Sequence, residues 1–168
     1  MLRGAIISEC GRYRYHLHRV WKEESPRIVT WIMLNPSTAD ADIDDPTIRR
    51  CVGFARSWGY DGIEVINLFP FRATKPADLK KADDPVGPLG DYYLEQTCRQ
   101  AGAERLLLCA WGAHGGFRGR DKEVGELLSE YTLHALELTK KQQPRHPLYL
   151  KGSLEPFEWS PARGTDPR

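Results

Sequence analysis

The sequence predicts an α/β fold with a mainly parallel central sheet. Apolar, β-branched runs of strand length alternate along the chain with segments whose apolar residues recur at helical spacing. Several of these runs are almost continuously apolar, as in strands that are covered by helices on both faces. Because each helix must carry the chain back to the same edge of the sheet, the alternation implies right-handed crossovers between parallel strands.

The first part of the chain contains three predicted strands and one helix. Residues 12–21 alternate aromatic or aliphatic side chains with arginine and histidine, which predicts an edge strand that is solvated on one face. Residues 27–34 form a nearly continuous apolar run that ends at an Asn-Pro-Ser loop, as expected for a buried strand. An Asp-Pro pair then predicts the N-cap and first position of a helix over residues 45–59. The next strand covers residues 63–68.

The second part continues the alternation of helices and strands. Residues 74–81 predict a short helix that begins at a Thr-Lys-Pro sequence, and residues 89–102 predict a longer helix. Residues 105–111 form another buried strand, which runs into a glycine-rich loop. A helix over residues 121–131 and a last strand over residues 133–138 complete the pattern.

Length and composition indicate one domain without a membrane segment. The 168 residues suit a single α/β domain over residues 1–151, followed by an irregular tail over residues 152–168 that is rich in Pro, Gly and Arg. The formal net charge is +1, so any attraction to nucleic acid must come from local patches. The sequence shows neither a signal peptide nor a stretch of bilayer-spanning length. We therefore expect a cytoplasmic location and no membrane partner.

Neither the cysteines nor the acidic residues predict a metal site. The four cysteines are far apart and form no CxxC pair, which argues against a zinc ribbon or an iron–sulfur cluster. An aspartate-rich segment over residues 40–45 lacks the glycine and the bidentate acid of a calcium loop. We expect no metal and no cofactor.

The most unusual polar segments follow the predicted strands. In parallel sheets the ligand crevice lies beyond the carboxyl ends of the strands, so these segments should be neighbours. Their asparagines, histidines, hydroxyls and glycines suit hydrogen bonding to a neutral polar ring, or the positioning of a water molecule. The four segments are Asn35-Pro36-Ser37-Thr38, Asn67-Leu68-Phe69-Pro70, Trp111-Gly112-Ala113-His114 and His146-Pro147-Leu148-Tyr149.

These segments carry a resemblance to a known family. The chain resembles the Domain of Unknown Function 1643 family across roughly Val29 to Leu150. The matching motifs are LNPSTAD, DPTIRR, WGYDGIEVINLFPFRAT, CAWG and RHPLYL. The family name implies no particular chemistry.

The order of the loops is also similar, more distantly, to that of the uracil-DNA glycosylase superfamily. The shared features are an Asn-Pro loop after an early strand, an asparagine that ends a strand, a strand that ends in Trp-Gly, and a late His-Pro segment. The resemblance implies a three-layer sandwich around a mainly parallel sheet. It also implies that Asn35 positions the attacking water, that Asn67 recognises the base edge, and that His146 engages the base.

The other candidate residues come from the same loops. Phe69 is a candidate for stacking on a base, although an aromatic side chain at a strand end can instead plug the core. Asn35 and Asn67 can alternatively tie loops through their amides. An exposed basic loop is the structural alternative for residues 118–122. The candidate phosphate-binding residues are Ser37, Thr38, His114, Arg118, Arg120, Lys122 and Arg145.

The resemblance implies a nucleobase-binding protein that hydrolyses an N-glycosidic bond in DNA or in a nucleotide. In such a reaction positive charge develops on the sugar and negative charge on the base, so a positioned water and a donor to the base are needed. Two alternatives stay open: an enzyme that acts on a small nucleoside or nucleotide, and a non-catalytic module that binds nucleic acid or protein. The expected partner is nucleic acid or a nucleotide, and the sequence leaves the oligomeric state and catalysis itself undecided.

Overall fold

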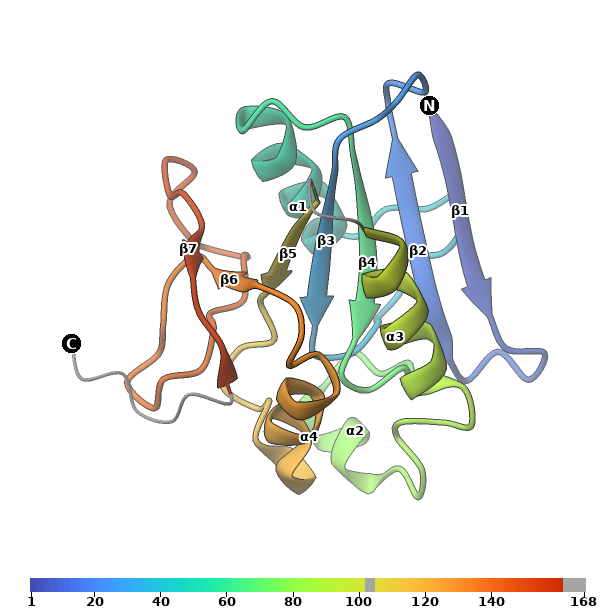
Figure 1. The fold of residues 1–168 in the computed structure, drawn as a ribbon. Coiled ribbons are helices and arrows are strands. Elements are labelled where there is room, and N and C mark those ends of the chain that lie inside the picture. Colours follow the sequence, from blue (N-terminus) through green and yellow to red (C-terminus); the bar gives the residue numbers. More distant parts are fainter. Residues whose placement is uncertain (102–104, 162–168) are drawn as a thin grey trace.

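The computed structural model of the chain describes residues 1–101 and 105–161 and shows an α/β fold (Figure 1). Within these residues the strands form one mixed sheet in the order β1-β2-β4-β3-β5-β6-β7. The strands are β1 (Leu2–Ile7), β2 (Arg14–Val20), β3 (Ile28–Met33), β4 (Gly62–Asn67), β5 (Leu106–Cys109), β6 (Leu133–Ala135) and β7 (Phe157–Glu158).

The centre of the sheet is parallel and its edges are antiparallel. Strands β4, β3, β5 and β6 pair in parallel, whereas β2, β1 and β7 pair antiparallel at the two sides. The expected α/β class is therefore confirmed, and the sheet is a mixed one with a parallel centre. In Figure 1, β3, β4 and β5 run in one direction, and their carboxyl ends face the end of the molecule where α2 and α4 lie.

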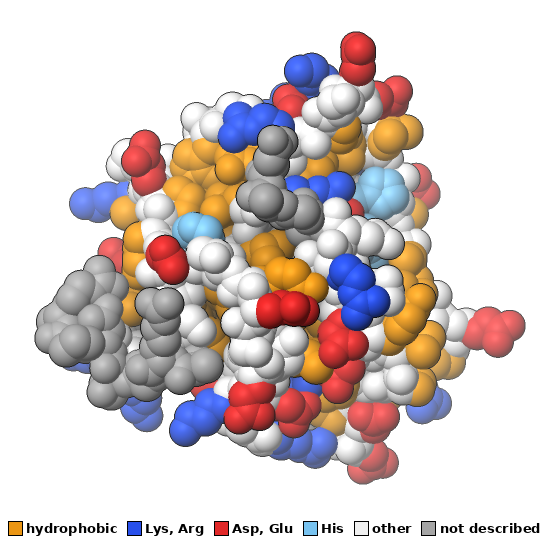
Figure 2. All heavy atoms as spheres, viewed as in Figure 1, with side chains coloured by type: hydrophobic (Ala, Val, Ile, Leu, Met, Phe, Trp, Pro, Cys, Tyr) orange, Lys and Arg blue, Asp and Glu red, His pale blue; other side chains and the backbone are white. Residues whose placement is uncertain are grey.

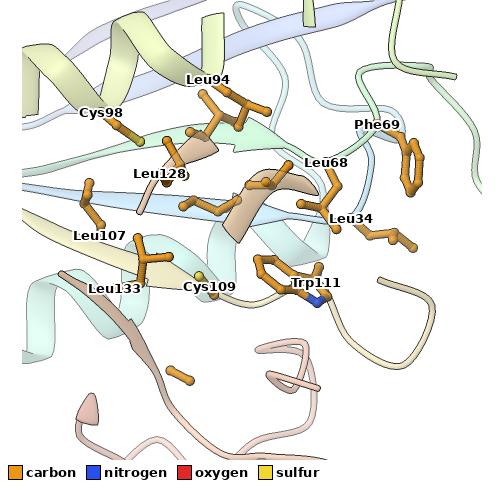
Figure 3. Close-up of a cluster of buried hydrophobic side chains, with 14 of the residues drawn as sticks. Leu34, Leu68, Phe69, Leu94, Cys98, Leu107, Cys109, Trp111, Leu128 and Leu133 are labelled. Carbon is orange, nitrogen blue, oxygen red and sulfur yellow. The ribbon is translucent and has the colours of Figure 1, made fainter. Parts of the chain in front are cut away.

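Helices cover both faces of the sheet. The helices of the described residues are α1 (Pro46–Ser57), α2 (Pro76–Lys81), α3 (Gly90–Ala101) and α4 (Arg120–Leu127), with a short 3-10 helix at Phe117–Gly119. One apolar cluster joins α1 to one face of β3 and β4, and a second joins α2, α3 and α4 to the opposite face. Figure 3 shows the second cluster, with Leu94 and Cys98 of α3 near Leu107 and Cys109 of β5. None of these helices combines the length and apolar character needed to cross a bilayer.

The Asp-Pro signal for α1 is confirmed. Asp45 is the N-cap, and its side chain accepts a hydrogen bond of 2.9 Å from the backbone N–H of Ile48. Pro46 occupies the first turn, where it needs no backbone donor. After the helix, Gly59 has a φ of 79°, which glycine adopts without strain.

Strand β2 differs from its prediction as a half-solvated edge strand, because β1 pairs with it on the outer side. Ile6 pairs with His16 and Ile7 pairs with Arg14, so one extra residue, Tyr15, stands on β2. Such a bulge interrupts the alternation of side chains between the two faces. Arg14 is consequently buried, although the period-two pattern placed it on the solvated face.

The chain end also differs from expectation, because β7 lies in the segment predicted to be irregular and pairs with β6. The last residues of that segment, 162–168, lie outside the described residues.

Arg120 is a structural residue and not the phosphate-binding residue that the sequence suggested. It exposes 2% of its surface, and its Nε donates to Leu68 O at 2.9 Å. Its two terminal nitrogens pair with the carboxylates of Asp91 on α3 and Glu123 on α4. A guanidinium with these partners cannot reach a phosphate. It instead fixes the segment that follows β4 against two helices.

We expect Arg120→Met to lower the free energy of unfolding by about 1 to 3 kcal/mol, because Leu68 O would lose its buried donor. The exposed neighbour Lys122 serves as the control, and Lys122→Met should change the stability by less than about 0.5 kcal/mol. Urea denaturation of both variants checks this expectation. Equal effects of the two substitutions would contradict it.

Candidate functional site

A cleft of about 380 Å³ lies at the carboxyl ends of the central strands. Parallel pairing sets β3 and β4 level, because Met33 pairs with Asn67 at the ends of the two strands. The pairing continues beyond the strands, where Leu68 N donates to Met33 O at 2.8 Å. Segments that follow β3, β4 and β5 therefore meet at one edge of the sheet, as the sequence predicts for an α/β fold.

The cleft brings together five of the residues that the sequence singled out. It is lined by residues from all four expected loops, although they are separated by more than a hundred positions in the chain. The prediction that the two asparagines and the late histidine share one crevice is confirmed. The five residues are Asn35, Ser37, Asn67, His114 and His146.

Asn67 is the most unusual residue of the cleft. It ends β4, lines the cleft and exposes only 1% of its surface. Neither its Nδ2 nor its Oδ1 has a hydrogen-bond partner in the described part of the chain. A buried polar group without a partner costs roughly 1 to 3 kcal/mol. An unpaired buried amide in a residue that lines a cleft therefore needs an explanation beyond packing.

Asn35 has its amide nitrogen occupied by the protein. Its Nδ2 donates to Ala73 O at 2.8 Å and to Pro36 O at 3.1 Å. These bonds tie the loop after β3 to the segment that precedes α2. The alternative role, in which Asn35 ties two loops together, is therefore the role of its side-chain nitrogen. Its Oδ1 accepts no hydrogen bond from the residues that the structure describes.

His146 is held as a neutral ring. Its Nδ1 accepts a hydrogen bond of 3.2 Å from the backbone N–H of Leu148, so in the neutral ring the proton stands on Nε2. Burial lowers the pKa of His146 below its ordinary value, and the carboxylate of Asp45 opposes this change only in part. The ring can thus act as a neutral donor through Nε2–H.

Two sets of contacts fix the loops around His146. Arg50 on α1 donates to the carbonyl oxygens of Pro147 and Leu150. On the other side, Trp111 Nε1 donates to Gln143 Oε1 at 2.7 Å, which joins the loop after β5 to the segment before His146. These contacts tie the segment around His146 to α1 and to the loop after β5.

The cleft also contains residues that the sequence analysis did not assign to it. Arg14 was missed because the bulge in β2 breaks the alternating pattern. Asp45 was recognised only as a helix cap, although a cap after a parallel strand lies by topology near the carboxyl edge of the sheet. That signal could have placed Asp45 in the site. The lining residues outside the predicted segments include Arg14, Asp45, Thr47, Thr74 and Pro76.

Phe69 does not line the cleft and is fully buried, with 0% of its surface exposed. Its ring lies 5.6 Å from that of Phe117, within the cluster on the α3 side of the sheet (Figure 3). The prediction that it stacks on a base is wrong, because the ring completes the core. The alternative of a core plug is confirmed.

The basic residues of the predicted loop over residues 118–122 do not line the cleft. Arg118 donates to Ala82 O at 3.1 Å and Asp83 O at 3.3 Å, near α2. Lys122 lines a separate hollow beside Trp159. Thr38 is exposed and does not line the cleft. Arg145 lines a neighbouring hollow that shares His146 with the cleft, and its Nη1 lies 3.7 Å from Glu137 Oε2. Acidic and basic side chains are interspersed over the face in Figure 2.

Metal ligands are not grouped in the described residues. No three side chains among histidine, cysteine, aspartate and glutamate lie in an arrangement that could hold an ion there. The polar groups of the cleft are amides, hydroxyls, one arginine, one aspartate and two histidines. This set suits hydrogen bonding to an uncharged polar ring and to charged oxygen atoms.

Comparison with known proteins identifies the family of the chain. The model of the family described as "Protein of unknown function (DUF1643)" matches residues 14–148, so the chain belongs to this family. The match covers all four loops that line the cleft up to Leu148. No curated protein and no solved structure matches the chain.

We expect the ring of His146 to titrate below about pH 6.5, the ordinary value for histidine. Below that pH the unfolded chain binds more protons than the folded chain. The stability that the neutral ring contributes is therefore complete above about pH 6.5 and declines as the pH falls toward the folded-state value. An NMR titration of the ring, assigned with His146→Gln, measures this pKa. A midpoint at or above 6.5 would contradict the expectation.

Proposed function

We propose that this member of the DUF1643 family binds a nucleobase in the cleft, with the amide of Asn67 paired to the edge of the base. The observation that carries this proposal is the buried, unpaired amide at the end of β4. A side-chain amide offers one donor and one acceptor side by side, and the edge of a nucleobase presents the same pair in reverse. A ligand of this kind would satisfy both atoms together.

The other walls of the cleft support a flat, partly apolar ligand. Met33, Leu34, Val65, Trp111 and Leu148 contribute apolar side chains to the lining. The volume of about 380 Å³ lies within the usual range for small-molecule sites. Few polar groups among apolar walls are typical of pockets that orient a ring and read its edge.

We further propose that the cleft hydrolyses an N-glycosidic bond, as the resemblance to the uracil-DNA glycosylase superfamily implies. His146 Nε2–H would donate to the base as negative charge develops on it. The Oδ1 atom of Asn35 would orient the attacking water, and the carboxylate of Asp45 would stabilise the positive charge on the sugar. The water would add to the anomeric carbon while the base leaves with the bonding electrons. One proton of the water would stay on the new sugar hydroxyl and the other would pass to the base, while His146 would keep its Nε2 proton and stabilise the departing base through the hydrogen bond.

A second candidate is an enzyme that acts on a small nucleoside or nucleotide. It is favoured by the position of the basic residues, because Arg118, Arg120 and Lys122 do not border the cleft. A strand of nucleic acid would need phosphate contacts along its path, and its binding would weaken steeply with added salt. A small ligand would need neither.

The direct test of the reaction is an incubation with substrates of both classes. Single- and double-stranded oligonucleotides that carry normal and modified bases are compared with free nucleosides and nucleotides. Abasic sites and released base are then measured. Release of base by the wild type, and its loss in His146→Gln, would support hydrolysis. If base-bearing probes bind but no base is released, the proposal of a nucleobase site stands and the proposal of hydrolysis is wrong.

We expect Asn67→Leu to stabilise the free protein and to weaken binding of the base. Leucine has the same branching as asparagine but no polar atoms, so the cost of the unpaired amide disappears and the free energy of unfolding should rise by about 1 to 3 kcal/mol. Affinity for the base should fall by about tenfold or more. Urea denaturation and calorimetric titration measure the two effects.

The matched control is Asn35→Leu, which removes the hydrogen bonds to Ala73 O and Pro36 O. This variant should lose about 1 to 3 kcal/mol of stability. The interpretation of Asn67 is wrong if Asn67→Leu destabilises the protein as much as Asn35→Leu does.

A further inference from the structure

Arg14 brings a second unpaired polar group to the cleft that contains Asn67. It begins β2, lines the cleft and exposes only 2% of its surface. Its Nη1 donates to Ala39 O at 3.0 Å, whereas its Nε has no partner in the described residues. In that part of the chain five buried side-chain atoms lack a partner, and three of them belong to Arg14 and Asn67. Three of the five unpaired atoms therefore belong to two residues that line one cleft.

Arg14 also differs from the other buried arginines in its charge pairing. Arg19 Nε lies 2.7 Å from Asp44 Oδ1, and Arg120 Nη2 lies 2.6 Å from Asp91 Oδ1. Arg14 forms no ion pair within 4.0 Å in residues 1–101 and 105–161. A buried cation without a partner is costly, so the fold holds Arg14 at a cost that a bound anion would offset.

The charges around Arg14 leave it positive. Burial lowers its pKa to about 10, with Asp45 opposing this change and Arg72 and Arg19 adding to it, so the guanidinium stays protonated at neutral pH. Asp45 Oδ1 already accepts a hydrogen bond from the N-terminus of α1. Its negative charge lies at the positive end of a helix dipole, and it forms no ion pair with Arg14 within 4.0 Å.

We propose that Arg14 binds a phosphate group of the same ligand whose base pairs with Asn67. The inference rests on the proposed function and narrows it, because the ligand is then a nucleotide unit and not a neutral nucleoside or a free base. A guanidinium presents planar donors that match phosphate oxygens, and such charge-assisted hydrogen bonds are stronger than neutral ones. The phosphate belongs either to a free nucleotide or to a nucleic-acid strand.

Calorimetric titrations of the full chain test this inference. The probes are the common nucleosides, their 5′-monophosphates and short single-stranded oligonucleotides, with wild type, Arg14→Met and Arg118→Met as proteins. The wild type should bind the matching monophosphate at least about tenfold more tightly than the nucleoside. Arg14→Met should lose this advantage. Arg118→Met removes a cation outside the cleft, so this variant should still bind the monophosphate more tightly than the nucleoside.

The ratio of the two affinities does not depend on the folded fraction of a variant. If Arg14→Met fails to fold, Arg14→Lys replaces it, and this variant should retain only part of the advantage because it keeps the charge without the planar donors. Equal affinity of the wild type for nucleoside and monophosphate overturns the inference. An equal loss of both affinities in Arg14→Met overturns it as well.

Inorganic phosphate separates this inference from the proposed function. If no base-bearing probe binds, but phosphate raises the melting temperature of the wild type and not of Arg14→Met, the anion site stands and the nucleobase proposal fails. If no probe, phosphate included, shows an effect that depends on Arg14, the inference fails. Tighter, salt-sensitive binding of the oligonucleotide would place the phosphate in a strand, whereas preference for the monophosphate would identify a free nucleotide.

Discussion

The parallel pairing of β3 with β4 and β5 is the constraint on which the cleft depends. Hydrogen bonds of the ladder continue past the strand ends, where Phe69 N donates to Leu34 O at 2.9 Å and Ala110 N donates to Ile32 O at 2.8 Å. The three strands therefore end at the same edge of the sheet. Every loop that leaves this edge must turn over the same space, which gathers distant polar residues into one site.

Two pairs of buried polar side chains differ in how their atoms are satisfied. Every side-chain nitrogen of Arg19 and Arg120 has a protein partner, and these contacts hold the loop before α1 and the segment after β4 in place. Asn67 and Arg14 line the cleft, and each has at least one buried side-chain atom without a partner in the described residues. The first pair stabilises the framework of the site. The second pair costs stability in the free protein, and strain of this sort is commonly retained where a ligand relieves it.

The sequence predicted the framework better than the roles of single residues. Continuous apolar runs and the Asp-Pro cap are local signals, so the central strands and α1 were predictable, and topology then placed Asn35, Asn67 and His146 at one edge. Burial at loops and bulges depends on tertiary packing, which no local pattern records. For that reason Phe69 and Arg120 were assigned to ligand binding although both complete the interior, and Arg14 was overlooked.

The side-chain amide of Asn67 can be observed directly by ¹⁵N NMR of the full chain during titration with nucleosides and nucleotides. The amide of Gln143, whose nitrogen donates to Asp121 Oδ2 and which does not line the cleft, provides an internal reference. The Asn67 resonances should shift in proportion to the bound fraction, while those of Gln143 change much less. Binding of a base that leaves the Asn67 amide unchanged would show that the unpaired group at the end of β4 is not the recognition element.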